Sequence, residues 1–134
     1  FKQFVEWNSF DLFQIPYSAL QIENENTMNT AGENGAGIII NGAVALGEPD
    51  IGKGSKLVWD NFEKYNLQEF LDTNETKTSF MLRFTLSNKN AHTAIVGTTN
   101  PEHLKMNIES VLKGPLDIGL YNQVRKRIDS SLAG

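Results

Sequence analysis

The stretch "TAIVGTTNPEHL", residues 93–104, passes directly from the pattern of a strand to that of a helix. Its apolar, β-branched run at 94–96 is typical of a buried strand. Asn100 suits a helix N-cap, Pro101 the first helical position and Glu102 the first turn. Apolar residues then recur at helical spacing on one face: Leu104, Ile108, Val111 and Leu112. The pattern predicts a strand at 92–97 and a helix from 101 that ends at the Gly-Pro pair 114–115.

Two earlier segments show the same succession of strand and helix. Residues 11–17 read as a strand that Pro16 stops, and residues 36–42 form the near-continuous apolar run of a strand buried on both faces. Helical patterns cover residues 2–7, a short segment ending near 32–35, residues from 55 through 72, residues 76–88 and residues 116–128, with a loop at 43–55. Alternating strands and helices predict one α/β domain over residues 1–134, with about three parallel strands.

Composition narrows the function classes. The net charge of -4 argues against a general nucleic-acid surface, and the absence of cysteine excludes disulfides and a cysteine nucleophile. No run of about 18 apolar residues is present, so we expect no membrane span. The first residues have no features of a signal peptide, and we expect a cytoplasmic protein. The chain starts without Met and inside a helical pattern, so we also expect it to be incomplete.

The turn at 97–100 has the features of an anion site. Gly97 permits close backbone approach, Thr98 and Thr99 add donors, and free backbone N–H groups meet the positive end of the helix dipole. This combination predicts a phosphate site at the helix start. The alternative is an ordinary capped helix whose threonines only satisfy the turn.

Two amides interrupt the apolar strands. Gln14 lies between Phe13 and Ile15, and a buried amide there needs partners, which a ligand amide could supply. The alternative is an amide that points out of the strand to solvent. Asn41 ends the next strand and could face the same ligand site as Gln14, or it could be a turn residue before Gly42. Neither His92 nor His103 has a partner at metal-ligand spacing, so we expect no metal and assign neither a catalytic role.

The sequence resembles the C-terminal half of an aldo/keto reductase. The resemblance rests on four segments in that family's order, of which the last is the most specific: "FDLFQIPYSAL", "GAGIIINGAVALG", "SFMLRFTLSN" and "TAIVGTTNPEHLKMNI" followed by "GPL". It implies half of a (β/α)8 barrel of the TIM type, in which residues 11–17, 37–41 and 93–97 are the sixth, seventh and eighth strands. It also implies a nicotinamide dinucleotide as the cofactor, usually NADPH.

The resemblance assigns the cofactor contacts residue by residue. Gln14 would meet the nicotinamide carboxamide, while Asn41 and Gly42 would border the nicotinamide and pyrophosphate. The adenosine phosphate would lie at Thr98, Thr99 and Asn100, and Asn107 would face the adenine. Two positions depart from the family pattern, because Gly97 stands where many relatives have a basic residue and His103 where they have an arginine. These departures leave NADH possible, although Lys105 could partly compensate.

The family's catalytic Asp, Tyr, Lys and His belong to the other half of the barrel, and no segment here matches that half. We therefore expect a chain that carries the dinucleotide-binding part of an NAD(P)H-dependent aldehyde or ketone reductase, and that is inactive alone. The alternative is a non-catalytic half-barrel that binds a nucleotide or a partner chain. Three strands cannot close a barrel, so we expect one sheet face to be open and covered by self-association or by the missing half.

Overall fold

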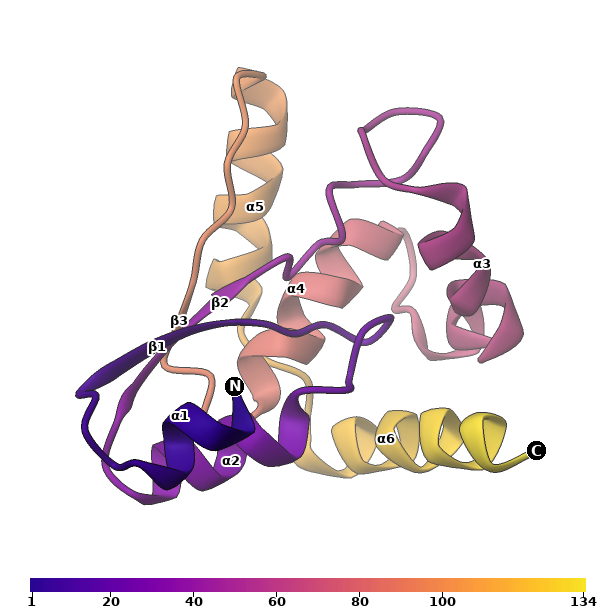
Figure 1. Cartoon of the computed structure of the whole chain (residues 1–134). Helices are drawn as coiled ribbons and strands as arrows, with labels where there is room; N and C mark the ends of the chain where they lie inside the picture. Colours follow the sequence, from indigo (N-terminus) through magenta and orange to yellow (C-terminus); the bar gives the residue numbers. More distant parts are fainter.

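The computed structural model describes residues 1–134 and forms one α/β unit (Figure 1). Its elements are, in order, α1 (Lys2–Glu6), β1 (Leu12–Pro16), α2 (Glu25–Glu33), β2 (Gly37–Asn41), α3 (Lys56–Lys64), the 3-10 helix η1 (Leu67–Phe70), α4 (Lys77–Ser87), β3 (Thr93–Ala94), α5 (Pro101–Lys113) and α6 (Ile118–Ala133). The predicted order of strands and helices is confirmed. The last strand is shorter than the predicted 92–97, because only residues up to Ile95 hydrogen-bond with β2.

The three strands form a parallel sheet in the order β1-β2-β3. Leu12 pairs with Gly37 and Pro16 with Asn41, and β3 joins through the pairing of Ile39 with Thr93. The β2–β3 ladder starts with a side chain, since Nδ1 of His92 accepts a hydrogen bond from the Ile38 N–H at 3.0 Å. His92 therefore has a structural partner. The sheet has two free edges, one along β1 and one along β3.

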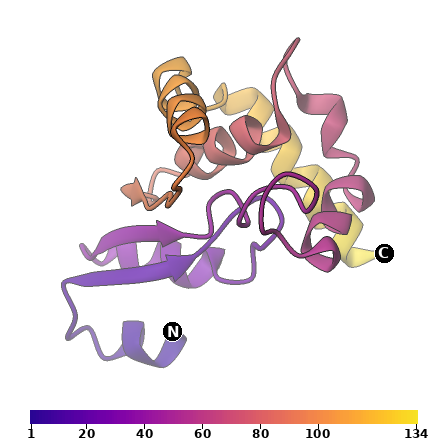
Figure 2. The same ribbon diagram turned by 90° about the horizontal axis from the view of Figure 1, so that it is seen from above.

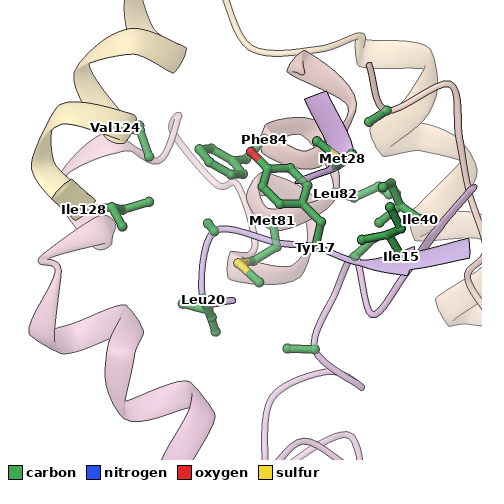
Figure 3. Close-up of a cluster of buried hydrophobic side chains, with 14 of the residues drawn as sticks. Ile15, Tyr17, Leu20, Met28, Ile40, Met81, Leu82, Phe84, Val124 and Ile128 are labelled. Atoms are coloured by element: carbon green, nitrogen blue, oxygen red, sulfur yellow. The ribbon is translucent and has the colours of Figure 1, made fainter. Parts of the chain in front are cut away.

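One face of the sheet is covered and holds the core. Phe13, Ile15, Ile38 and Ile40 are buried on this face, where α2 and α4 pack. Figure 3 shows Ile15 and Ile40 beside Leu82 of α4 and near Met28 of α2, and Phe84 of α4 beside Tyr17, with Val124 and Ile128 of α6 farther out. The near-continuous apolar strands thus supply the layer that the helices bury, as is usual in a β/α barrel wall.

The other face of the sheet is open. Leu12 and Gln14 of β1 are exposed on it, Ile39 and Asn41 of β2 are half-buried, and Ile95 is 52 % exposed. In a closed barrel these side chains would point to the interior. The predicted open face is therefore confirmed, and the amides of Gln14 and Asn41 and the hydroxyl of Thr93 lie on it among apolar side chains.

Apolar helix surfaces flank both free edges of the sheet. Figure 2 shows α1 beyond β1 and α5 toward the β3 side, at opposite ends of the sheet. The α1 end exposes an aromatic group in which Phe4 contacts Trp7 and Phe10 edge to face. On α5 the whole predicted apolar face is exposed, so its packing against a core is not found within this chain: Leu104, Ile108, Val111 and Leu112. Instead α5 contacts α4 through Ser110, the one buried residue of the helix.

The loop between β2 and α3 folds back on itself. The two halves of this loop approach each other at three glycines, Gly47, Gly52 and Gly54. They lie so close that a Cβ on Gly54 would be 1.9 Å from the Gly47 carbonyl oxygen. The indole N–H of Trp59 donates to the carbonyl of Ala45 at 3.2 Å and ties the loop to α3. No helix is both long and apolar enough to cross a lipid bilayer.

Candidate functional site

Two amide side chains meet the open face of the sheet on neighbouring strands. In the β1–β2 register Gln14 is opposite Ile39 and Asn41 is opposite Pro16, so both amides project from the same face. Strand spacings place their Cα atoms about 8 Å apart on the diagonal. Gln14 is exposed rather than buried, so the interpretation as an internal amide is wrong and the outward-pointing alternative holds. It points outward because the barrel interior that would surround it is open here.

Asn41 is the polar group on this face that lacks a partner. Its Oδ1 atom is buried and accepts no hydrogen bond. The neighbours in its row are Pro16 on β1 and, with the β2–β3 register continued by one residue, Ile95. Neither side chain has a donor. Buried polar atoms are rarely left unpaired in proteins, so the oxygen of Asn41 is an exception within this fold.

The chain turns sharply directly after Asn41. Gly42 has a φ of 72°, in the left-handed region, and Ala45 and Leu46 follow with φ of 46° and 62°. For residues with a side chain this conformation costs about 1–3 kcal/mol each. Such strain is concentrated at functional sites in proteins, and here it follows the strand that carries the orphaned amide.

The start of α5 is capped by its own side chains. Oδ1 of Asn100 accepts from the Glu102 N–H at 3.0 Å, and Oγ1 of Thr98 accepts from the Asn100 N–H at 3.1 Å. The predicted cap is thus confirmed. These contacts occupy two of the donors that a phosphate would use. The backbone N–H groups of Thr98 and Thr99 form no hydrogen bond within the protein and remain exposed, as does Gly97.

His103 and Asn107 lie one turn apart on α5 and are both half-buried. They project from a different side of the helix than the exposed apolar residues. The predicted site residues therefore form two groups: the amides with Gly42 at the ends of β1 and β2, and Gly97–Asn100 with His103 and Asn107 on α5. The two groups are not joined by any hydrogen bond.

Two charged clusters, each built around a buried carboxylate, lie outside these groups, and the sequence analysis missed both. Oε1 of Glu25 accepts from Tyr17 at 2.6 Å and from Tyr121 at 3.3 Å, while Oε2 pairs with Arg125 at 2.6 Å. Burial, together with the Glu25 charge, raises the pKa of Tyr17. Glu25 stands in the polar run "ENENTMN", which has the composition of a surface segment, so only the packed helices reveal its burial.

The second cluster joins α4 to the end of α5. Arg83 pairs with Glu75 at 2.6 Å and with Asp72 at 3.2 Å, and Lys113 pairs with Asp72 at 2.7 Å. Lys113 and then Arg83 lower the pKa of Asp72. Burial alone would raise the pKa of Glu75, but the hydrogen bonds from Arg83 and the Asp72 N–H outweigh it and the pKa is lowered. All charges are paired, so the cluster is structural.

No set of three or more histidine or acidic side chains is arranged to hold a metal ion. Two surface hollows, of about 200 and 220 Å³, are lined mainly by polar and charged residues from α3, α4, α5 and the loops next to them. Both lie away from the open face. The candidate site is therefore the open edge region of the sheet and the start of α5, rather than an enclosed cavity.

Comparisons with known proteins agree on the fold. The aldo-keto reductase AKR11C1 from Bacillus halodurans in its holo form superposes with a TM-score of 0.74 at 20% identity, over 94% of this chain and 44% of that chain. Its apo form gives a TM-score of 0.73 at 20% identity, with 94% and 46% covered. No family model and no curated protein matches the sequence.

This chain thus spans less than half the length of the reductase structures that it resembles. The covered part is the α/β unit described above, with three parallel strands and an open sheet. The chain has the fold of about half of an aldo-keto reductase (β/α)8 barrel.

Proposed function

We propose that this chain is the dinucleotide-binding portion of an aldo/keto reductase-type oxidoreductase. The parent reaction is the NAD(P)H-dependent reduction of an aldehyde or ketone to an alcohol. The observation that carries the proposal is the placement of Gln14 and Asn41 on one open face of adjacent parallel strands, with the Asn41 oxygen unpartnered. The likeness of the fold to AKR11C1 supports it.

The residues fit the two ends of an extended dinucleotide. Gln14 and Asn41 hold the nicotinamide, and Gly42 gives the pyrophosphate access to the backbone. The free N–H groups of Thr98 and Thr99 and the α5 dipole take the adenosine phosphate, with Asn100 shaping the turn. His103 and Asn107 border the adenosine. NADPH is the proposed cofactor, with NADH as an alternative, because Gly97 and His103 add no fixed positive charge. No metal is required.

When bound, the dinucleotide supplies the hydride for carbonyl reduction. The reaction also needs a proton donor whose pKa is tuned by its neighbours. None of the three tyrosines here serves: Tyr65 is buried in the core, and Tyr17 and Tyr121 are buried in the Glu25 cluster on the covered side of the sheet. We assign the proton donor to barrel units outside this sequence, so this chain alone binds the cofactor without turning over substrate.

The open face of the sheet exposes apolar side chains, and we propose that a second copy of the chain buries them. The molecule exposes 7875 Å². A compact monomer of 15.0 kDa exposes about 7,000 Å². The excess of about 800 Å² equals what one partner buries in a standard interface. Each copy has an aromatic surface at the β1 edge and an aliphatic surface on α5, so two copies related by an axis along the strands can cover both.

A half-barrel that binds a nucleotide or a partner chain without any role in catalysis is the second candidate. A measurement of catalytic turnover distinguishes these two candidate functions. If the chain mixed with a complementary N-terminal half of an aldo/keto reductase barrel gains activity toward 4-nitrobenzaldehyde, it is part of an enzyme. If it binds nucleotide but never supports turnover, the second candidate is favoured.

A fluorescence titration with NADPH and, separately, NADH tests the cofactor assignment. We expect saturable binding that Gln14→Ala and Asn107→Ala weaken. The matched control is Thr73→Ala, an exposed threonine that lies outside both groups. Absence of saturable binding by either dinucleotide would refute the proposal and leave the start of α5 as a simple capped helix.

A further inference from the structure

The hydrogen bond between His92 and Ile38 depends on the protonation state of the imidazole. Nδ1 of His92 accepts this bond from the Ile38 N–H at 3.0 Å. Because a backbone N–H can only donate, Nδ1 carries no proton while the bond exists. In the protonated ring both nitrogens carry a proton, so an N–H would point at the Ile38 N–H and the bond would be lost.

The Ile38 N–H has no other partner within reach. Ile38 is 0 % exposed, so water cannot replace the imidazole while β3 stays in place. A buried N–H without an acceptor is destabilising, and movement of β3 away from β2 relieves it by admitting water. His92 itself is exposed, so its ring exchanges protons with the solvent.

The strand that follows His92 is held to the sheet over a short length. β3 consists of Thr93–Ala94, and at its far end the Ile95 N–H donates to the Ile40 carbonyl at 2.8 Å. The neighbouring strands β1 and β2 are five residues long each. One hydrogen bond is therefore a large part of what joins β3 to β2, and its loss leaves β1 and β2 paired.

No neighbouring charge holds the ring in one protonation state. The charged residues that flank His92 at this end of the sheet are Asp11 before β1, Glu33 at the end of α2 and Lys89 in the turn before β3. Glu33 and Lys89 pair with each other at 3.3 Å, and none of the three forms an ion pair with His92. The ring is thus free to respond to the pH of the solvent.

We infer that His92 is a pH-sensitive switch for β3, which the neutral imidazole holds against β2 and which protonation in mildly acidic solution releases. β3 leads directly into the turn Gly97–Asn100 and α5, so its release moves this turn relative to the end of β2. A ligand that spans both parts is then held in neutral solution and released in acid. The inference concerns the packing of the sheet and is independent of which ligand binds there.

Amide hydrogen exchange of the full chain tests the inference, with rates expressed as protection factors so that the intrinsic effect of pH is removed. Between pH 7.5 and pH 5.5 the protection of the Ile38 and Ile95 amides should fall about tenfold, the linkage expected when one ordinary histidine must be neutral. The Tyr17 N–H, which donates to the Asn41 carbonyl at 3.2 Å within the β1–β2 pair, should keep its protection.

Variants of the two histidines identify the group responsible. His92→Asn puts an amide oxygen, which does not titrate, close to the position of Nδ1, so Ile38 should stay protected at both pH values. His92→Phe removes the acceptor, so Ile38 should exchange readily at both. His103→Asn changes the other histidine of the chain and should keep the wild-type response.

Three results would each overturn the inference. The first is a wild-type protection of Ile38 that does not change with pH. The second is a response to pH that survives in His92→Asn. The third is an equal loss of protection at Tyr17, which would report unfolding of the whole sheet rather than release of β3.

Discussion

The phenol oxygen of Tyr17, at the end of β1, lies 2.6 Å from Oε1 of Glu25 on α2. Tyr121 of α6 approaches the same oxygen at 3.3 Å, and Arg125 takes the other at 2.6 Å. A carboxylate this deeply buried would destabilise the fold if it stood alone. Together these donors join the sheet to α2 and to the C-terminal helix.

Replacing Tyr17 by Phe should lower the free energy of unfolding by about 1–3 kcal/mol, because Glu25 loses one of its two closest donors while staying buried. Urea unfolding followed by circular dichroism measures the loss. Tyr65→Phe is the matched control, since the Tyr65 hydroxyl forms no hydrogen bond within the protein and should change stability by about 0.5 kcal/mol or less. Equal losses in the two variants would show that the Glu25 contact contributes nothing.

Stability should also fall in alkaline solution. Burial first, and the Glu25 charge second, raise the pKa of Tyr17, and burial likewise raises the pKa of Tyr121. Above a pH of about 10 the unfolded chain loses these protons while the folded protein keeps them, so unfolding becomes easier as the pH rises. Denaturation midpoints from pH 8 to pH 11 should decline in the wild type and decline less steeply in Tyr17→Phe. Parallel curves would contradict this.

Stability should also fall in acidic solution, because the ion pairs of one cluster are lost when its carboxylates are protonated. This cluster consists of Asp72, Glu75, Arg83 and Lys113. The folded pKa values of both carboxylates lie below their unfolded values, so their contribution is complete above a pH of about 4.5 and is lost as the pH falls through the lowered values. Glu75→Gln should flatten the fall in unfolding midpoint between pH 5 and pH 3. Glu109→Gln, which forms no salt bridge, should keep the wild-type slope. A slope unchanged by Glu75→Gln would exclude the cluster as its cause.

Asn100→Ala should destabilise α5 by about 1 kcal/mol, because the Glu102 N–H loses the side chain that caps it. Hydrogen exchange at the first turns of α5 reports the change locally. Thr99→Ala serves as the control, since the Thr99 side chain forms no hydrogen bond within the protein. If both variants exchange alike, the cap is not what holds the start of this helix.

Light scattering at micromolar concentration should give the mass of a dimer. Ile95→Lys and Ile108→Lys place charges on the open face and on the α5 surface, and each should shift the equilibrium toward monomer by about tenfold or more. Leu132→Lys, on an exposed position near the end of α6, should leave the mass unchanged. A wild-type monomer would show that a second copy does not cover the sheet, and mixing with a complementary barrel half would then test that occupant.

The order of elements was predictable because each is encoded locally. The run at 37–41 and the Asn-Pro-Glu start of α5 require only their own residues, and both were predicted correctly. The amphipathic pattern of α5 was also correct, but its apolar face is exposed and does not lie against the core of this chain. Periodicity identifies which residues share a face but not what lies against it. Leu57 shows the same limit, since its helical spacing is right and it is 81 % exposed.

The candidate site was less predictable than the fold. The pattern identified Gln14 and Asn41 as unusual, but only the β1–β2 register shows that they share a face. The unpartnered state of Asn41 depends on Pro16 and Ile95, which are far from it in sequence. The burial of Glu25 is likewise a property of the packed helices. These features arise from contacts between distant segments, which a local pattern does not encode.

The parallel register also determines the order in which the sheet can assemble. Leu12 reaches Gly37 across a single helix, whereas the His92 contact with Ile38 joins residues 54 positions apart. Closing the longer loop costs more chain entropy and is repaid by a strand of only two residues, Thr93–Ala94. We therefore expect the β1–α2–β2 unit to form first, and β3 with α5 to dock last and to detach first during a partial opening.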